Sequence, residues 1–173
     1  MTQNNKKQIK TDLQSENPLI VLEAIQKLRQ EGSPVLLEAL IELLCSTGND
    51  DIKTTIILFL DDLRDQKSVT VILKAIQNEK YKNDKGTIVS SCWKSGLDFS
   101  SALDVFLEIF ISDEFTIALE AYSVLENDIP ILPKEDVDKH LDYLKEIQNI
   151  PPDRKPLALD IVNMLEGRKA GTI

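Results

Sequence analysis

Apolar residues recur along this chain in a nine-residue pattern that appears at three distant positions. Residues 20–28 read I-V-L-E-A-I-Q-K-L and residues 117–125 read I-A-L-E-A-Y-S-V-L, with five of the nine positions identical. Residues 157–165 read L-A-L-D-I-V-N-M-L and keep the leucine, the acidic residue and the closing leucine. In the first copy the apolar residues, beginning with Ile20, lie on one face of a helix, which we expect to be buried. A helix that recurs along a chain predicts a repeat architecture.

Capping residues, prolines and glycines mark where the helices begin and end. Asn17-Pro18 and Ser33-Pro34 each place a capping side chain before a proline, and proline suits the first position of a helix. Gly32 is placed to end the first of these helices. The chain shows no alternation of apolar and polar residues long enough for a strand, so every element is predicted to be a helix.

Two series of helices alternate along the chain. The first series aligns at Ile20, Thr55, Ile88, Ile117 and Leu157. Ile52 would serve as well as Thr55 in the second of these helices. The second series shares a core that aligns, in steps of 32, 34 and 34 residues, at Leu40, Ile72, Phe106 and His140. The connections are short, which makes consecutive helices antiparallel neighbours.

These patterns predict an all-α fold with one repeat domain. We expect a right-handed superhelical solenoid over residues 16–166, with about four helix pairs and a closing C-terminal helix. Residues 1–15 are predicted to be a polar segment or a short capping helix, and residues 167–173 a C-terminal tail.

Two stretches resemble the HEAT-repeat family, in particular its short bacterial type. Asp51-Ile52-Lys53 followed by I-I-L-F-L resembles the family's opening of an acid, any residue, valine and arginine. Leu28 with Gly32 resembles the leucine and glycine that close the family's first helix. The resemblance covers residues 16–166, although other residues replace the usual arginine at Val21, Val89 and Ala118. Tetratricopeptide repeats have a similar period, but their Trp, Gly and Tyr pattern is absent.

The resemblance implies antiparallel helix pairs whose second helices line a concave face, in a binding scaffold more often than in an enzyme. Some HEAT-like proteins resemble bilin lyases or base-excision glycosylases. The glycosylases work through a basic, aromatic groove that this sequence lacks.

Charge and hydropathy restrict the partners that we expect. The chain carries 20 basic and 29 acidic residues, a net charge of −9, and has no basic stripe. Nucleic acid is itself densely anionic, so we expect no nucleic-acid partner. The N-terminus has no apolar run after its lysines, and no stretch approaches the length of a membrane span. These observations predict a cytoplasmic protein with no membrane association.

The residue types that carry chemistry are few and scattered. Cys45 and Cys92 sit in different predicted helices beside apolar residues, so we expect two buried free thiols. His140 is the single histidine, and one histidine with Asp136 does not make a zinc site, so we expect it to be solvated or capping. The six glycines form no phosphate-binding loop. We therefore predict a non-catalytic protein with no cofactor and no metal.

One pattern on the second helices has functional content. The core alignment places Glu42, Lys74, Glu108 and Asp142 at equivalent positions. One turn earlier the equivalent positions are Glu38, Thr70, Asp104 and Asp138. Equivalent positions stack into a ladder in a solenoid, and six of these eight are acidic. We predict that this acidic strip binds a basic segment of a partner protein; the alternative is the solvated side of amphipathic helices.

Three alternatives to this site or function stay open. Tyr81 and Trp93 flank the most irregular segment and form a secondary candidate surface near a groove. A lyase-like or glycosylase-like enzyme would require a pocket with a perturbed titratable group, near Trp93 or His140. Self-association of the chain is a third hypothesis.

Overall fold

The computed structural model describes residues 3–31, 36–146 and 150–173, and this described part is built from α-helices joined by short turns and single 3₁₀ turns, without a strand. The prediction of an all-α fold is confirmed. The chain divides into two compact units, Met1–Leu97 and Asp98–Ile173, and each unit is described by itself. The predicted boundaries at Gly32 and Ser33-Pro34 lie outside the described residues.

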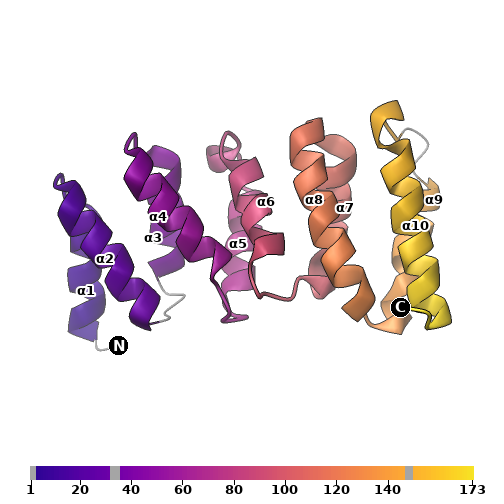
Figure 1. Ribbon diagram of the computed structural model, residues 1–173, viewed down its shortest axis with the longest axis horizontal. Helices are drawn as coiled ribbons and strands as arrows, with labels where there is room; N and C mark the ends of the chain where they lie inside the picture. The colour runs from indigo at the N-terminus through magenta and orange to yellow at the C-terminus, as the bar shows by residue number, and fades with distance from the viewer. Residues whose placement is uncertain (1–2, 32–35, 147–149) are drawn as a thin grey trace. The chain divides into compact units, whose positions relative to one another are not determined.

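The first unit contains three helical hairpins (Figure 1). Its helices are α1 (Gln3–Asp12), α2 (Pro18–Glu31), α3 (Leu37–Ser46), α4 (Asp50–Asp61), α5 (Ser68–Ile76) and α6 (Lys85–Lys94). In each hairpin an odd-numbered helix packs against the even-numbered helix that follows it. The even-numbered helices also pack side by side, α2 on α4 and α4 on α6, while α3 packs on α5. The unit therefore has one layer of even-numbered and one layer of odd-numbered helices.

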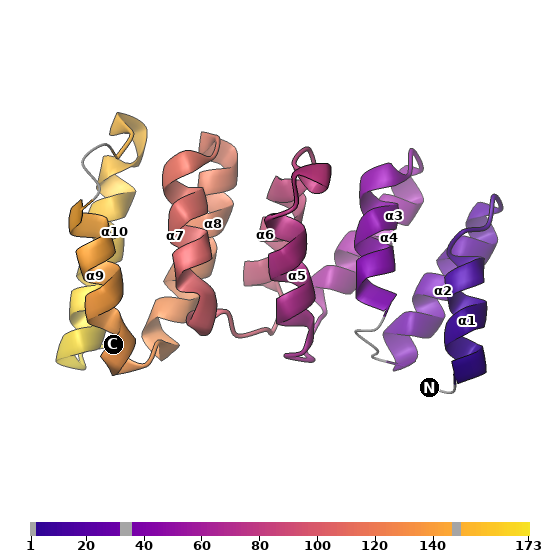
Figure 2. The same ribbon diagram turned by 180° about the vertical axis from the view of Figure 1, so that it is seen from behind.

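The second unit contains two hairpins of the same kind (Figure 2). Its helices are α7 (Leu103–Ser112), α8 (Phe115–Asp128), α9 (Val137–Glu146) and α10 (Lys155–Ala170). Helix α7 packs extensively on α8, α9 packs on α10, and α8 contacts α10. Gly171, with φ of 77°, ends α10 in the left-handed conformation, and the helix therefore extends into residues 167–173, which we expected to be a C-terminal tail.

Each even-numbered helix pairs with the helix before it, and not with the helix after it as we predicted. We expected the helix that begins at Pro18 to pair with the helix that follows it, whereas the structure pairs α2 with α1, and α4 with α3. Ile9 and Leu13 of the N-terminal segment are buried, so this segment supplies the partner of α2. Only residues 47–49 separate α3 from α4, and so tight a connection returns the chain directly onto α3.

The nine-residue pattern places the same positions in the core of both units. Its second, fifth and ninth positions are buried in α2, α8 and α10, at Val21, Ala24, Leu28, Ala118, Ala121, Leu125, Ala158, Ile161 and Leu165. In α4, Ile56 and Phe59 are buried in the register that starts at Thr55, while Ile56 and Leu60 are buried in the register that starts at Ile52, so burial fits both registers. Ile20 is 39% exposed, so its predicted burial is wrong. Because the second, fifth and ninth positions of α2 are buried, its first position lies closer to the solvent-facing side of the helix.

Candidate functional site

The six predicted acidic residues are all exposed and all lie on odd-numbered helices. They divide between the two units: Glu38 and Glu42 lie on α3, Asp104 and Glu108 on α7, and Asp138 and Asp142 on α9. Helices α7 and α9 lie on the same side of the second unit, as Figure 2 shows. We call the four carboxylates on α7 and α9 the acidic face of the second unit.

The net charge of the chain is concentrated in this second unit. Residues 1–97 contain 13 basic and 13 acidic side chains, so the first unit is neutral overall. Residues 98–173 contain 7 basic and 16 acidic side chains and therefore carry the whole net charge of −9. A net charge of this size produces a field that attracts cationic partners and repels anionic ones.

Three of the six candidate carboxylates already have a lysine partner. Lys80 Nζ lies 2.5 Å from Glu42 Oε1, and Lys169 Nζ lies 2.5 Å from Asp138 Oδ1. Lys145 Nζ lies 3.4 Å from Asp142 Oδ1. The remaining three, which form no ion pair with any described residue, are Glu38, Asp104 and Glu108.

Tyr143 of α9 brings an aromatic ring to the acidic face. Its side chain is 39% exposed, and burial, followed by the charges of Glu108 and Asp104 on α7, raises the pKa of its phenol. Asp104 and Glu108 are also the two carboxylates of this face that form no ion pair with a described residue. The core alignment could have singled out Tyr143. It follows the ladder position of Asp142, and the equivalent residues in the other repeats, Leu43, Ala75 and Ile109, are all aliphatic.

His140 is buried, so the prediction of a solvated or capping histidine is wrong. It is 5% exposed and occupies the core position that Phe106 fills in α7. Burial, and then the charge of Lys139, lower the pKa of its imidazole, while Asp104 and Asp136 act in the opposite direction. The imidazole is therefore neutral at pH 7 and adds no positive charge to the acidic face.

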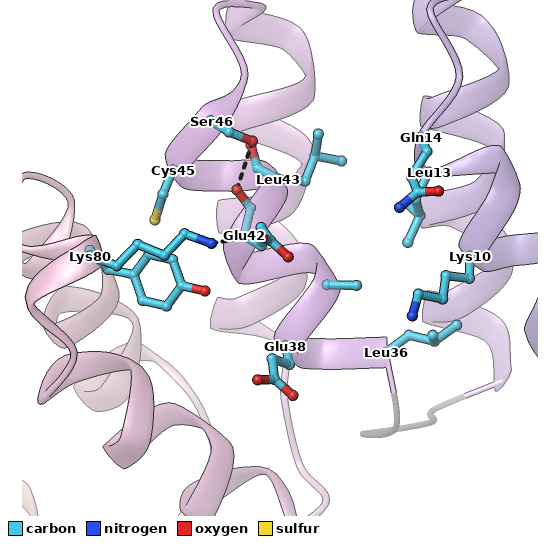
Figure 3. Close-up of a pocket in the computed structure, with 12 residues that line it drawn as sticks. Lys10, Leu13, Gln14, Leu36, Glu38, Glu42, Leu43, Cys45, Ser46 and Lys80 are labelled. Carbon is cyan, nitrogen blue, oxygen red and sulfur yellow. Dashed lines mark hydrogen bonds and ion pairs between the residues drawn. The ribbon is translucent and has the colours of Figure 1, made fainter.

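In the first unit, Glu38 and Glu42 line an open groove of about 510 Å³. Figure 3 shows its two sides, with Lys10 approaching from α1 and Lys80 approaching from the 3₁₀ turn Glu79–Tyr81. Lys80, through its hydrogen bond and charge, lowers the pKa of Glu42, and Lys10 acts in the same direction. The groove thus places two lysines around one of its two carboxylates. The apolar part of its lining is Leu13, Leu36, Ala39 and Leu43.

The secondary candidates, Tyr81 and Trp93, are not brought to one site. Tyr81 is buried and lines the groove together with a smaller cavity of about 120 Å³, which Glu38 and Lys74 also line. Trp93 is exposed on α6, with the Lys94 ammonium 5.2 Å from its ring centroid, and lines neither cavity.

The two thiols lie in different surroundings. Cys92 is buried, as predicted, and its thiol donates a hydrogen bond to the Ile88 carbonyl at 3.4 Å. Cys45 is only partly buried. Burial, and then the charge of Asp84, raise the pKa of Cys45 to about 11. Its reactive thiolate form is therefore scarce at neutral pH.

Within the described ranges, no three His, Cys, Asp or Glu side chains gather as metal ligands would. None of the described helices combines the length and apolar character that crossing a membrane requires. Neither a protein-family model nor a curated protein matches this chain.

Proposed function

We propose that this chain is a HEAT-like helical-repeat protein, a non-catalytic interaction module that binds a basic protein segment on the acidic face of its second unit. The observation that carries the proposal is the pair of exposed carboxylates Asp104 and Glu108. They have no ion-pair partner among the described residues, in a unit whose net charge is −9. A basic segment would relieve the repulsion among these carboxylates.

The contribution of the first unit to this binding is smaller than the sequence suggests. Glu42 is occupied by Lys80, and the unit as a whole is neutral, which leaves Glu38 as its candidate for a cationic partner. The proposed binding surface is therefore led by Asp104 and Glu108, with Asp138 and Asp142 joining when their lysines are displaced. Such exposed ion pairs are weak and exchange readily.

The other functional hypotheses have less support. His140 is neutral and packed in the core, and the Cys45 thiol is held protonated, so neither favours a lyase-like or glycosylase-like reaction. The field of the second unit repels nucleic acid. Self-association remains a hypothesis that sedimentation of the pure protein would test.

Fluorescence anisotropy with a labelled peptide of nine lysines tests the proposed function. We expect binding by the wild type that weakens steeply between 50 mM and 200 mM salt, since exposed charges are increasingly screened. A double charge reversal, Asp104→Lys with Glu108→Lys, is expected to weaken binding at least tenfold, because it changes the local charge by four units.

A matched control separates the acidic face from net charge alone. Glu126→Lys with Asp160→Lys makes the same charge change at two exposed acids on α8 and α10. These two acids also flank a tyrosine, Tyr122, which lies against Phe110 with ring centroids 6.4 Å apart. The control should keep most of the affinity. Equal loss in both variants, or no binding by the wild type, would contradict the proposal.

A further inference from the structure

The open groove of the first unit has an apolar strip along its bottom. Leu13 and Leu36 line this strip next to α1, and Ala39 and Leu43 line it from α3 (Figure 3). In the same layer of helices α3 packs on α5, whereas among the described residues no comparable packing joins α1 to α3. The strip therefore lies where the row of odd-numbered helices is not closely packed.

The two helices that border the strip carry opposite charge. Helix α1 contains three lysines and one acidic residue, whereas α3 contains two glutamates and no basic residue. Lys10 of α1 and Glu38 of α3 both line the groove, and neither forms an ion pair with a described residue. An occupant of the strip thus meets an unpaired ammonium group on one side and an unpaired carboxylate on the other.

The groove suits a partner whose own backbone hydrogen bonds are complete. Its lining residues belong to helices and turns, and none of them belongs to a strand. The lining therefore offers no row of backbone N–H and C=O groups to an extended peptide. A helix satisfies its backbone internally and can bury an apolar face in a groove of this kind. The volume of about 510 Å³ lies within the range of pockets that bury several apolar groups.

We propose that this groove binds an amphipathic helix of a partner protein, which places leucine-type side chains on the apolar strip. The flank of that helix next to α1 carries an acidic residue that binds Lys10. The flank next to α3 carries a basic residue that binds Glu38. The ion pair of Lys80 with Glu42 stays in place on the other side of the groove. This helix is neutral overall, so it differs from the basic segment proposed for the second unit.

A labelled helical peptide with this pattern tests the site by fluorescence anisotropy. The probe has leucines at positions i, i+3, i+4 and i+7, glutamates on one flank and lysines on the other. A comparison peptide replaces every leucine by glutamine and keeps all charges. We expect the wild type to bind the leucine probe at least tenfold more tightly than the glutamine peptide, because only leucine gains from burial on the strip.

Charge reversal of Lys10 tests the border on α1. Lys10→Glu should weaken binding of the leucine probe about fivefold, since it replaces one exposed ion pair by a repulsion. Lys7→Glu makes the same change at an exposed residue of α1 that does not line the groove, and it should leave the affinity nearly unchanged. Glu38→Lys should weaken binding as Lys10→Glu does.

Ala39→Trp tests the apolar strip without a change of charge. Ala39 is half-buried on α3, and a large ring at this position fills the strip, so binding of the leucine probe should fall at least tenfold. Thr70→Trp places the same ring on an exposed position of α5 that lines neither cavity, and should keep the affinity. Circular dichroism checks that each variant is folded.

The thiol of Cys45 reports whether the probe occupies the groove itself. Cys45 lines the groove and is only partly buried, whereas Cys92 is buried. Modification of Cys45 by a maleimide, followed by mass spectrometry, should therefore slow several-fold when the leucine probe is bound. The glutamine peptide at the same concentration should not slow it.

The outcomes separate this inference from the proposed function. No binding of the leucine probe, or binding that Lys10→Glu and Ala39→Trp leave unchanged, would overturn the groove as a helix-binding site and would leave the basic-segment proposal standing. Asp104→Lys with Glu108→Lys should not affect this probe, because those residues lie in the second unit. Sedimentation that shows a dimer of the pure protein, dissociated by Ala39→Trp, would assign the groove to a second copy of this chain and overturn the partner helix.

Discussion

Asp128 offers the sharpest test of the electrostatics of the second unit. Its carboxyl group lies at the end of α8 and is 6% exposed. Burial, and then the charge of Asp98, raise its pKa from 3.8 to about 6, although the backbone N–H of Phe99 donates a hydrogen bond to it and acts in the opposite direction. Folding thus places a carboxyl group in surroundings that favour its protonated form.

The sign and size of the effect follow from linkage. The unfolded chain loses the Asp128 proton near pH 4, whereas the folded protein keeps it to about pH 6. The free energy of unfolding therefore falls as pH rises from 4 to 6 and stays lowered above pH 6. One pKa unit corresponds to about 1.4 kcal/mol, so the penalty at neutral pH is on the order of 2–3 kcal/mol.

Asp128→Asn removes the charge but keeps an oxygen that can accept the hydrogen bond from Phe99. We expect the variant to unfold with a free energy about 2 kcal/mol higher than the wild type at pH 7.5, and with no advantage at pH 4. Urea unfolding followed by circular dichroism at both pH values measures this difference.

The control is Glu126→Gln, which removes an exposed charge from the same helix and should change stability little at either pH. A gain for Asp128→Asn that is the same at pH 4 and pH 7.5 would show that charge burial is not its cause. No gain at pH 7.5 would show that the folded protein accommodates the carboxylate without cost.

Two further predictions concern helix ends in the second unit. Arg154 is buried and donates hydrogen bonds to the Phe110 carbonyl, at 2.6 Å, and to the Asp113 carbonyl at the end of α7. Arg154→Met should therefore lower the free energy of unfolding, measured in urea, by about 3 kcal/mol. A loss no larger than that of a surface substitution would contradict this role. Gly171 ends α10 with a positive φ, which alanine adopts only with strain, so Gly171→Ala should lower the free energy of unfolding by about 1 kcal/mol, measured by thermal unfolding. Ala170→Gly, at the neighbouring residue without a positive φ, should not show this strain.

Local features of the fold could be predicted from the sequence because they depend on neighbours along the chain. The 3.6-residue period identified the helices, and Asn17, named as a cap, accepts a hydrogen bond from the Leu19 N–H at 3.0 Å. The nine-residue pattern identified Val21, Ala118 and Ala158 as equivalent, and all three are buried.

The core position of His140 was the clearest failure among the candidate residues. The alignment placed it beside Leu40, Ile72 and Phe106, which are all buried, but its polarity led to the prediction of a solvated side chain. The alignment was the better guide, because a helix that packs on α10 buries its whole inner face whatever residue stands there.

The composition of the candidate site was only partly visible in the sequence. The six acids of the ladder are exposed on odd-numbered helices, but the alignment could not show which of them are neutralised. Lys80 pairs with Glu42 from 38 residues away, and Lys169 pairs with Asp138 from 31 residues away. No periodicity relates such residues, since they meet only through helix packing.

The sequence alone determined the helices, their repeat and the acidic character of the chain, because each of these follows from local spacing or composition. Only the tertiary structure decided that α1 pairs with α2, that the net charge belongs to the second unit, and that Lys80 and Lys169 neutralise Glu42 and Asp138. These results depend on contacts between residues far apart in the sequence. Such contacts are selected by the packing of whole helices and leave no regular signal along the chain.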